Sequence, residues 1–295
     1  MKKYRFIVYA LFLAATIILA QTDFDKVQIE AVKVSDTVYM LRGAGGNMVA
    51  CIGSDGVLLI DTEYSQLYEK IKDALHKLGG DKIKYVINTH WHGDHTSGNI
   101  NFAKDAPIIA HKNVRETMMH PKSRADRKTE PAKPEALPTI VYDTELKIYM
   151  NGETVELFHI PPGHTDGDTG IYFTKSNVLV TGDFFFNGSY PYIDLPNGGN
   201  VVDYAAGVKL LLGKINDDTK IIPGHGPLAT KKDFKAFYNM LVETTAYVKE
   251  KIDAGMSVDE IKKSGLPEKW KSWGEGFLKT EMWIDFICRS YGYQK

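Results

Sequence analysis

The segment NTHWHGDHTSG, residues 88–98, brings three histidines and an aspartate close together: His90, His92, Asp94 and His95. In an extended or loop conformation residues two apart face the same side, so the imidazoles of His90 and His92 can reach one ion. Gly93 permits a tight turn before Asp94 and His95. Neutral imidazoles and a carboxylate suit zinc, and iron or manganese less exclusively. The segment therefore predicts a metal site rather than a solvated histidine-rich loop.

Three further candidate ligands follow apolar strands. His164 lies in IPPGHTDGD, Asp183 follows NVLVTG, and His225 lies in IIPGHGP. Each has a glycine beside it, which lets backbone and ligand approach closely. A lone histidine at a strand end is usually structural, but three such positions together with the histidine segment predict one shared metal centre.

The motif His90-x-His92-x-Asp94-His95, followed by His164, Asp183 and His225, resembles the ligand set of the metallo-β-lactamase superfamily. The resemblance covers about residues 30–230 and implies an α/β fold, a four-layer αββα sandwich with two mixed sheets and C-terminal helices. It also implies the metal ligands: His90, His92 and His164 for a first ion, Asp94, His95 and His225 for a second, and Asp183 as the bridge between them. Asp61, which ends VLLID, matches a family aspartate that supports a ligand instead of binding metal.

The same resemblance implies two zinc ions, with iron or manganese as possible substitutes. A metal-bridging hydroxide would attack a small ester, thioester or lactam, and Asp94 would act in catalysis by orienting the nucleophile or delivering a proton. The ligand pattern is closer to that of glyoxalase II-like thioesterases than to true β-lactamases, which usually have cysteine or serine in place of Asp183.

Three other functions remain open at this point. The first is genuine or promiscuous β-lactamase activity. The second is a mononuclear iron dioxygenase of the persulfide type, because three ligands with open positions suit iron. The third is a non-catalytic metal-binding assembly factor. Metal content and a broad hydrolysis panel discriminate among them.

Substrate contacts are expected in two segments. The stretch after Asp183 offers Asn187, Tyr190 and Tyr192, with ordinary loop packing as the alternative. Residues 121–138 contain four prolines and eight charged residues, which predicts a surface loop that is either a lid or a plain connection.

The elements that position these residues alternate between strands and helices. Strands are expected at 37–42, 48–53, 56–62 and 83–89, with a helix that Ser65 caps and that buries Leu67, Ile71, Leu75 and Leu78 before Gly79. A further helix is expected to begin at Thr96. Strand–helix–strand alternation indicates a buried sheet, and ligands of such sheets collect beyond the carboxyl ends of strands.

The strand pattern resumes over residues 139–181 and again at 219–224, with a helix between them from Asp203. Residues 231–295 are expected to form a helical C-terminal extension. Thr230 caps a long helix with a stripe of Phe234, Phe237, Tyr238, Leu241 and Val242, and the capping box SVDE at 257–260 begins another.

The first 20 residues match a secretory signal peptide. A basic start is followed by a 15-residue uncharged apolar run, Phe6–Ala20, which is shorter than the roughly 20 residues a spanning helix needs. We therefore expect residues 21–295 to be the mature metallo-β-lactamase-fold domain, periplasmic or secreted, without stable membrane association after cleavage. An uncleaved anchor is the alternative.

The overall composition narrows the classes of molecule that the protein is expected to bind. A formal net charge of -1 gives no basic excess for nucleic acid, so the expected partner is a small-molecule substrate, while oligomeric state is not indicated. The two cysteines, Cys51 and Cys288, can pair in an exported protein or remain buried thiols. The histidines outside the motifs are expected to be structural: His76, His111, His120 and His159.

Overall fold

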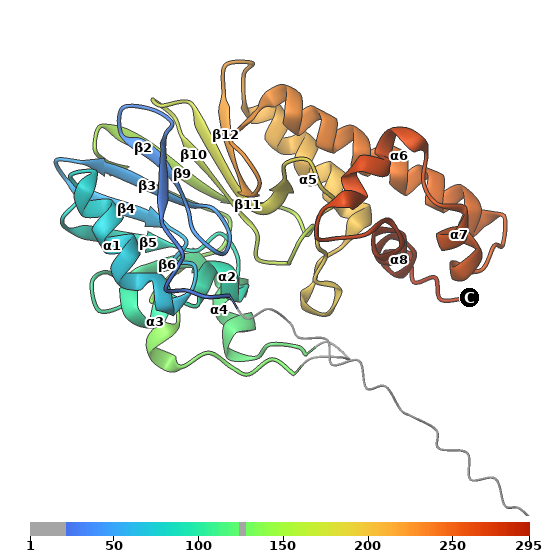
Figure 1. Ribbon diagram of the computed structural model, residues 1–295, viewed down its shortest axis with the longest axis horizontal. Helices are drawn as coiled ribbons and strands as arrows, with labels where there is room; N and C mark the ends of the chain where they lie inside the picture. Colours follow the sequence, from blue (N-terminus) through green and yellow to red (C-terminus); the bar gives the residue numbers. More distant parts are fainter. Residues whose placement is uncertain (1–21, 124–127) are drawn as a thin grey trace, which may run out of the picture.

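The computed structural model describes residues 22–123 and 128–295, so the expected signal peptide at 1–20 lies outside the described residues. Two β-sheets face each other, with helices on the outer side of each (Figure 1). This is the four-layer αββα arrangement expected from the resemblance, and the fold-class prediction is confirmed. Within the described ranges, no helix has the length and apolar character needed to cross a membrane.

The first sheet has seven strands in the order β1-β2-β3-β4-β5-β6-β7. Strands β1 to β4 pair antiparallel, whereas β4 to β7 pair parallel, so the sheet is mixed. Its strands are β1 (Glu30–Lys33), β2 (Val38–Arg42), β3 (Met48–Gly53), β4 (Gly56–Ile60), β5 (Ile83–Ile87), β6 (Ile108–His111) and β7 (Ile140–Tyr142).

The second sheet has six strands in the order β13-β12-β11-β10-β9-β8. Only the β11–β12 pair is parallel, so this sheet is mixed as well. Its strands are β8 (Glu145–Met150), β9 (Glu153–His159), β10 (Thr169–Phe173), β11 (Val178–Phe186), β12 (Lys220–His225) and β13 (Ala229–Thr230).

Alternating side chains of the buried strands point to different layers. On β3, Val49 and Cys51 face the cluster that lies between the sheets, which also contains Leu157 and Val180 of the second sheet. Met48, Ala50 and Ile52 face the opposite way, toward Ile71 and Leu75 of the first helix layer. Because side chains alternate along a strand, β3 contributes buried side chains to the cores on both faces of the sheet.

One helix layer covers each sheet (Figure 1). The helices near the first sheet are α1 (Tyr68–Lys77), α2 (Gly93–Thr96), α3 (Asn99–Phe102) and α4 (Lys112–Met119), with the 3-10 turns η1 (Ser65–Leu67) and η2 (Pro134–Ala136). Those near the second sheet are α5 (Val201–Lys214), α6 (Lys231–Asp253), α7 (Val258–Ser264) and α8 (Thr280–Ser290), with η3 (Leu195–Asn197) and η4 (Glu268–Glu275).

The C-terminal helices begin where their capping signals predict. Thr230 and Asp233 form a capping box at the start of α6, and Ser257 and Glu260 form another at the start of α7. Each pair satisfies two backbone N–H groups that would otherwise lack partners. The predicted stripe on α6 is wrong at Val242, which is 40% exposed.

Three other helix starts differ from expectation. Ser65 does not cap, because its hydroxyl donates to Gln66 and it lies inside η1. Asn200 caps α5 through its side-chain oxygen, so Asp203 lies in the first turn instead. The helix expected from Thr96 is two single turns, α2 and α3, and α2 already begins at Gly93.

Both cysteines are free and buried. Cys51 lies in the cluster between the sheets and Cys288 in the cluster under the C-terminal helices. Different layers hold the two thiols, so they do not pair.

Candidate metal centre

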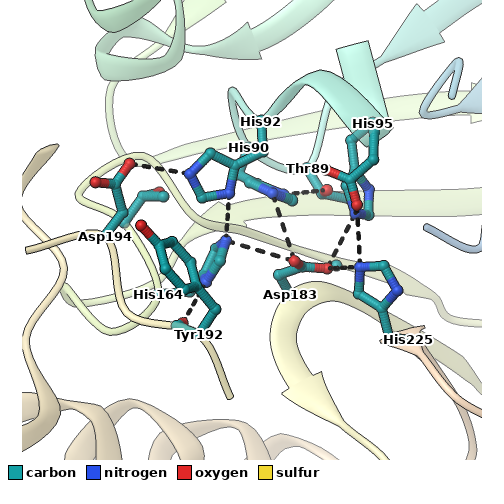
Figure 2. Close-up of polar contacts among 12 residues, drawn as sticks. Thr89, His90, His92, His95, His164, Asp183, Tyr192, Asp194 and His225 are labelled. Carbon is teal, nitrogen blue, oxygen red and sulfur yellow. Dashed lines mark hydrogen bonds and ion pairs between the residues drawn. The ribbon is translucent and has the colours of Figure 1, made fainter. Parts of the chain in front are cut away.

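All seven predicted ligands lie close together, near the ends of strands from both sheets. Figure 2 labels six of them, all but Asp94. The segments that carry them are the loop after β5 with His90 and His92, α2 with Asp94 and His95, the β9–β10 turn with His164, β11 with Asp183, and the end of β12 with His225.

A first group consists of His90, His92, His164 and Asp183, whose donor atoms all lie within 4.8 Å of one another. His164 Nε2 is 2.8 Å from His92 Nδ1. Asp183 Oδ2 is 3.5 Å from His164 Nε2 and 3.8 Å from His90 Nε2. One ion can therefore be reached by three imidazoles and one carboxylate oxygen.

A second group consists of Asp94, His95, Asp183 and His225, again within 4.8 Å. Asp183 contributes its other oxygen here, with Oδ1 3.0 Å from His95 Nε2 and 3.4 Å from His225 Nε2. Asp94 Oδ2 lies 3.2 Å from His225 Nε2. Asp183 thus belongs to both groups, one oxygen to each.

Buried ligand atoms that lack hydrogen-bond partners indicate whether these residues fit metal ions. Three donor atoms of the two groups have no hydrogen-bond partner among the described residues: His90 Nε2, His95 Nε2 and Asp183 Oδ1. A buried polar atom without a partner costs about 1–3 kcal/mol. Because these atoms converge and belong to residue types that zinc prefers, the donor set fits divalent metal ions.

Two backbone features bring Asp183 to this place. Gly182 has a φ of 51°, and the β11–β12 register shifts around it. A Cβ on Gly182 would lie 2.4 Å from the Thr89 hydroxyl, and one on Gly224 would lie 2.1 Å from Asp183 Oδ1. Glycine is therefore required on both sides of the shared carboxylate.

Each histidine of the first group has its second ring nitrogen held. His90 Nδ1 lies 3.1 Å from the Thr89 hydroxyl, and His164 Nδ1 donates to the carbonyl of Tyr192 at 2.7 Å. His92 Nε2 lies 2.9 Å from Asp194 Oδ2. Such contacts fix the tautomer, and they leave the other nitrogen facing the cluster.

Asp61 holds the second ring nitrogen of a histidine in the second group, His95. Its Oδ2 lies 2.8 Å from His95 Nδ1. The backbone N–H and the hydroxyl of Thr89 also donate to this carboxylate, at 2.8 and 2.7 Å. One buried aspartate therefore orients His95 directly and His90 through Thr89.

In the second group, the carboxylates favour a positively charged His225 and the histidines favour an ionised Asp183. Burial alone would raise the pKa of Asp183, but the charges of His225, His95 and His90 hold it well below its usual value. Burial would lower the pKa of His225, but Asp183 and Asp94 raise it to about 10. By contrast, burial and the neighbouring His95 hold the pKa of His90 well below normal, so His90 is a neutral donor.

A cavity of about 1060 Å³ opens onto the centre. Four of the ligands line it, namely His92, Asp94, Asp183 and His225. Residues of the 121–138 loop, including Lys122 and Lys133, line it too.

Of the three predicted substrate contacts, only Tyr192 lines this cavity among the described residues. Tyr190 is 1% exposed, stacks on Trp283 and donates its hydroxyl hydrogen to the Trp270 carbonyl, so its ring packs against the C-terminal extension. Asn187 donates to the carbonyl of Pro227 and is outside the lining as well.

Two aspartates of the centre were not predicted. Asp194 holds His92, as described above. Asp168 accepts hydrogen bonds from the backbone N–H groups of His164 and Thr165, which shapes the turn that carries His164. Burial raises the pKa of Asp168 to about 8. The local sequence signal was present in the run GHTDGD, where Asp168 follows His164 by four residues.

Two of the remaining histidines form a pair away from the centre. The rings of His111 and His159 stack at 3.8 Å with an interplanar angle of 2°. Neutral His111 is well satisfied, because Nε2–H donates to the Asp143 carbonyl and Nδ1 accepts from the Asn113 backbone. Burial, followed by the neighbouring His159, lowers the pKa of His111 to about 4.

This pair predicts acid sensitivity. The pKa of folded His111, about 4, lies below the ordinary 6.5, so the unfolded chain binds more protons between these values. The free energy of unfolding should therefore fall as pH drops from about 6.5 to about 4. Urea unfolding at several pH values should give a flatter profile for His111→Gln. The exposed His76→Gln serves as the control, and equal slopes for His111→Gln and the unchanged protein would contradict the assignment.

Comparison with known proteins agrees with this geometry. The sequence profile of the Metallo-beta-lactamase superfamily matches residues 41–225. A probable metallo-hydrolase of Methanocaldococcus jannaschii is 30% identical over 208 residues, which are 67% of this chain and 96% of that protein.

Other relatives carry different activities in their names. The 2,4-dinitroanisole O-demethylase subunit alpha of Nocardioides sp. is 28% identical over 77% of this chain and 67% of its own length. A hydroxyacylglutathione hydrolase of Polaromonas sp. is 29% identical over 60% of each chain. The solved structure of a metallo-beta-lactamase from Pontibacter korlensis superposes with a TM-score of 0.61 at 16% identity, covering 72% of this chain and 99% of that one, and shares the fold. On the profile match, these relatives and the two ligand groups, the chain belongs to the metallo-beta-lactamase superfamily.

Proposed function

We propose that the chain is a two-zinc hydrolase that cleaves a small ester, thioester or lactam. The observation that carries the proposal is the shared carboxylate of Asp183, which faces three histidines with one oxygen and the Asp94, His95 and His225 group with the other. Such an arrangement suits a pair of divalent ions better than a single one. Membership of a superfamily that consists mostly of metal-dependent hydrolases supports it further.

The residues of the chain have distinct tasks in this proposal. Bound zinc would lower the pKa of a water molecule and polarise the substrate carbonyl. Burial would raise the pKa of Asp94, but His95 and His225 lower it to about 2, so this carboxylate is ionised at neutral pH. Because Asp94 lines the cavity, its carboxylate can accept a hydrogen bond from the attacking water and orient it. Asp61 and Asp194 keep His95 and His92 in place.

A thioester or ester is the substrate we favour. The hydroxyacylglutathione hydrolase among the relatives supports thioester cleavage, whereas the metallo-beta-lactamase likeness supports the fold alone. Lactam hydrolysis belongs in the test because the superfamily includes it.

Metal removal tests the proposal. Protein purified without added metal should contain zinc, and it should hydrolyse members of an ester, thioester and lactam panel. Dialysis against a chelator should lower that activity at least about 100-fold, and zinc should restore it. His92→Ala should fail to regain activity, whereas His76→Ala, which alters an exposed histidine, should behave as the unchanged protein. One iron per chain without zinc, or full activity of His92→Ala, would contradict the proposal.

We also propose export, with residues 1–20 removed and residues 21–295 acting in the periplasm or outside the cell. The basic start and the short apolar run support this. N-terminal sequencing of the protein recovered from the periplasm tests it, and an intact N-terminus in the membrane fraction would contradict it.

A further inference from the structure

Phe277 is an exposed aromatic residue at the edge of the metal-site cavity. Its exposed fraction of 89% is the largest among the large apolar residues that the structure describes. It lies between η4 and α8 in the C-terminal extension, yet it lines the same cavity as Asp94, Asp183 and His225. A phenyl ring in water gains free energy when another apolar group covers it.

The turn that carries Phe277 is firmly held. Leu278, the next residue, is 1% exposed. Lys279 Nζ donates to the carbonyls of Glu275 and Gly276, which closes the turn on itself. Gly276 packs so closely on Ser189 that a Cβ on Gly276 would lie 3.0 Å from Ser189 Cβ. The position of Phe277 is therefore set by packing.

The same packing links this turn to the metal centre. Tyr190 N–H donates to the Trp273 carbonyl, and the Tyr190 ring stacks on Trp283 at 5.6 Å. Tyr192 contacts Phe286 edge-on at 5.4 Å, and its carbonyl accepts the hydrogen bond from His164. The C-terminal extension and the ligand His164 thus both contact one segment, residues 190–192.

Other apolar side chains line the cavity as well. They include Trp91, Met118, Phe186 and Tyr192. Because metal ligands and Phe277 line the same cavity, a ligand that contacts both needs a metal-seeking oxygen and an apolar tail.

We propose that Phe277 determines specificity by covering an apolar chain of the substrate, so that the preferred substrates are acyl esters or thioesters with an extended aliphatic or aromatic group. This inference rests on the proposed hydrolase function. The C-terminal extension would then contribute to the substrate site in addition to packing on the second sheet.

Ligand binding tests the inference without turnover. Acetate and octanoate share the carboxylate and differ in the tail, so calorimetric titration of the zinc-loaded protein should show tighter binding of octanoate. Phe277→Ala should weaken octanoate binding about tenfold, which corresponds to about 1.4 kcal/mol, and leave acetate binding unchanged. Met282→Ala is the matched control, since Met282 is 48% exposed on α8 but is not among the described residues lining the cavity.

Hydrolysis of 4-nitrophenyl acetate and 4-nitrophenyl octanoate gives the second measurement. Phe277→Ala should raise KM for octanoate alone, with kcat unchanged. If neither ester is cleaved, the proposed hydrolase function is in doubt, while the titration still decides the role of Phe277. The inference would be overturned if the unchanged protein bound octanoate and acetate equally tightly. It would also be overturned if Phe277→Ala lost the same affinity for both ligands, or changed only the self-association of the protein.

Discussion

Replacing Asp183 with alanine is expected to abolish hydrolysis and to remove at least one metal ion per chain. Asp183 is the only residue of the described chain that belongs to both ligand groups. Its Oδ1 lies 3.0 Å from His95 Nε2, and its Oδ2 lies 3.5 Å from His164 Nε2. Without this carboxylate each group loses its shared ligand, and the first group loses its only negative charge. We expect a loss of activity of roughly 10³-fold or more.

The measurement combines metal content with turnover. Elemental analysis should find close to two zinc ions in the unchanged protein and at most one in Asp183→Ala. Asp183→Asn keeps the size of the side chain but removes its charge, so it should lose metal as well. Asp73→Ala changes an exposed aspartate on α1 and should have no effect.

Stability separates loss of metal from loss of folding. Addition of zinc should raise the melting temperature of the metal-free unchanged protein, since a ligand that binds only the folded state stabilises it. Asp183→Ala should stay folded and show a smaller zinc-dependent rise. Two zinc ions retained with full activity in Asp183→Ala would contradict the shared-ligand assignment.

Local sequence signals account for the parts of the fold that were predicted correctly. The capping boxes at Thr230 and Ser257 satisfy backbone groups within four residues, so they can be read directly from the chain. The strands β3 and β4 are nearly continuous apolar runs because both of their faces are buried, and β11 begins with the apolar run Val178–Val180. The candidate ligands stood out because His164, Asp183 and His225 all follow apolar strands in the same chain as the histidine segment, although a single such residue would usually be structural.

Contacts between distant segments account for what was missed. Tyr190 carries a hydroxyl close to Asp183 in the chain, but its packing is decided by Trp270 and Trp283 of the C-terminal extension. The strand β6 and the helix α4 were not predicted, although both lie between the histidine segment and the 121–138 loop. Asp194 lies 102 residues from the histidine that it holds, and no periodicity connects the two.

Asp194 is expected to set the metal affinity of the first group. This carboxylate is 2% exposed and lies 2.9 Å from His92 Nε2, while Trp91 Nε1 donates to it at 3.2 Å. The Asn197 amide donates to both of its oxygens, at 3.0 and 2.9 Å. Burial would raise the pKa of Asp194, but the hydrogen bond and charge of His92 lower it, so the group is held as a carboxylate.

Removal of this support should weaken metal binding without removing a ligand. Partners of metal-bound histidines contribute about 10–100-fold to affinity, so we expect Asp194→Ala to lose about 100-fold and Asp194→Asn about tenfold in the first group. Competition with a chromophoric chelator measures the affinity, and the absorption spectrum of the cobalt-substituted protein reports the geometry around His92.

The second group provides an internal control, because Asp61 holds His95 independently of Asp194. Its affinity should be unchanged in both variants. Asn197→Ala should have a smaller effect than Asp194→Ala, since Asn197 acts on His92 only through that carboxylate. If Asp194→Ala binds both ions as tightly as the unchanged protein, the contact with His164 alone is sufficient to orient His92, and the role assigned to Asp194 is wrong.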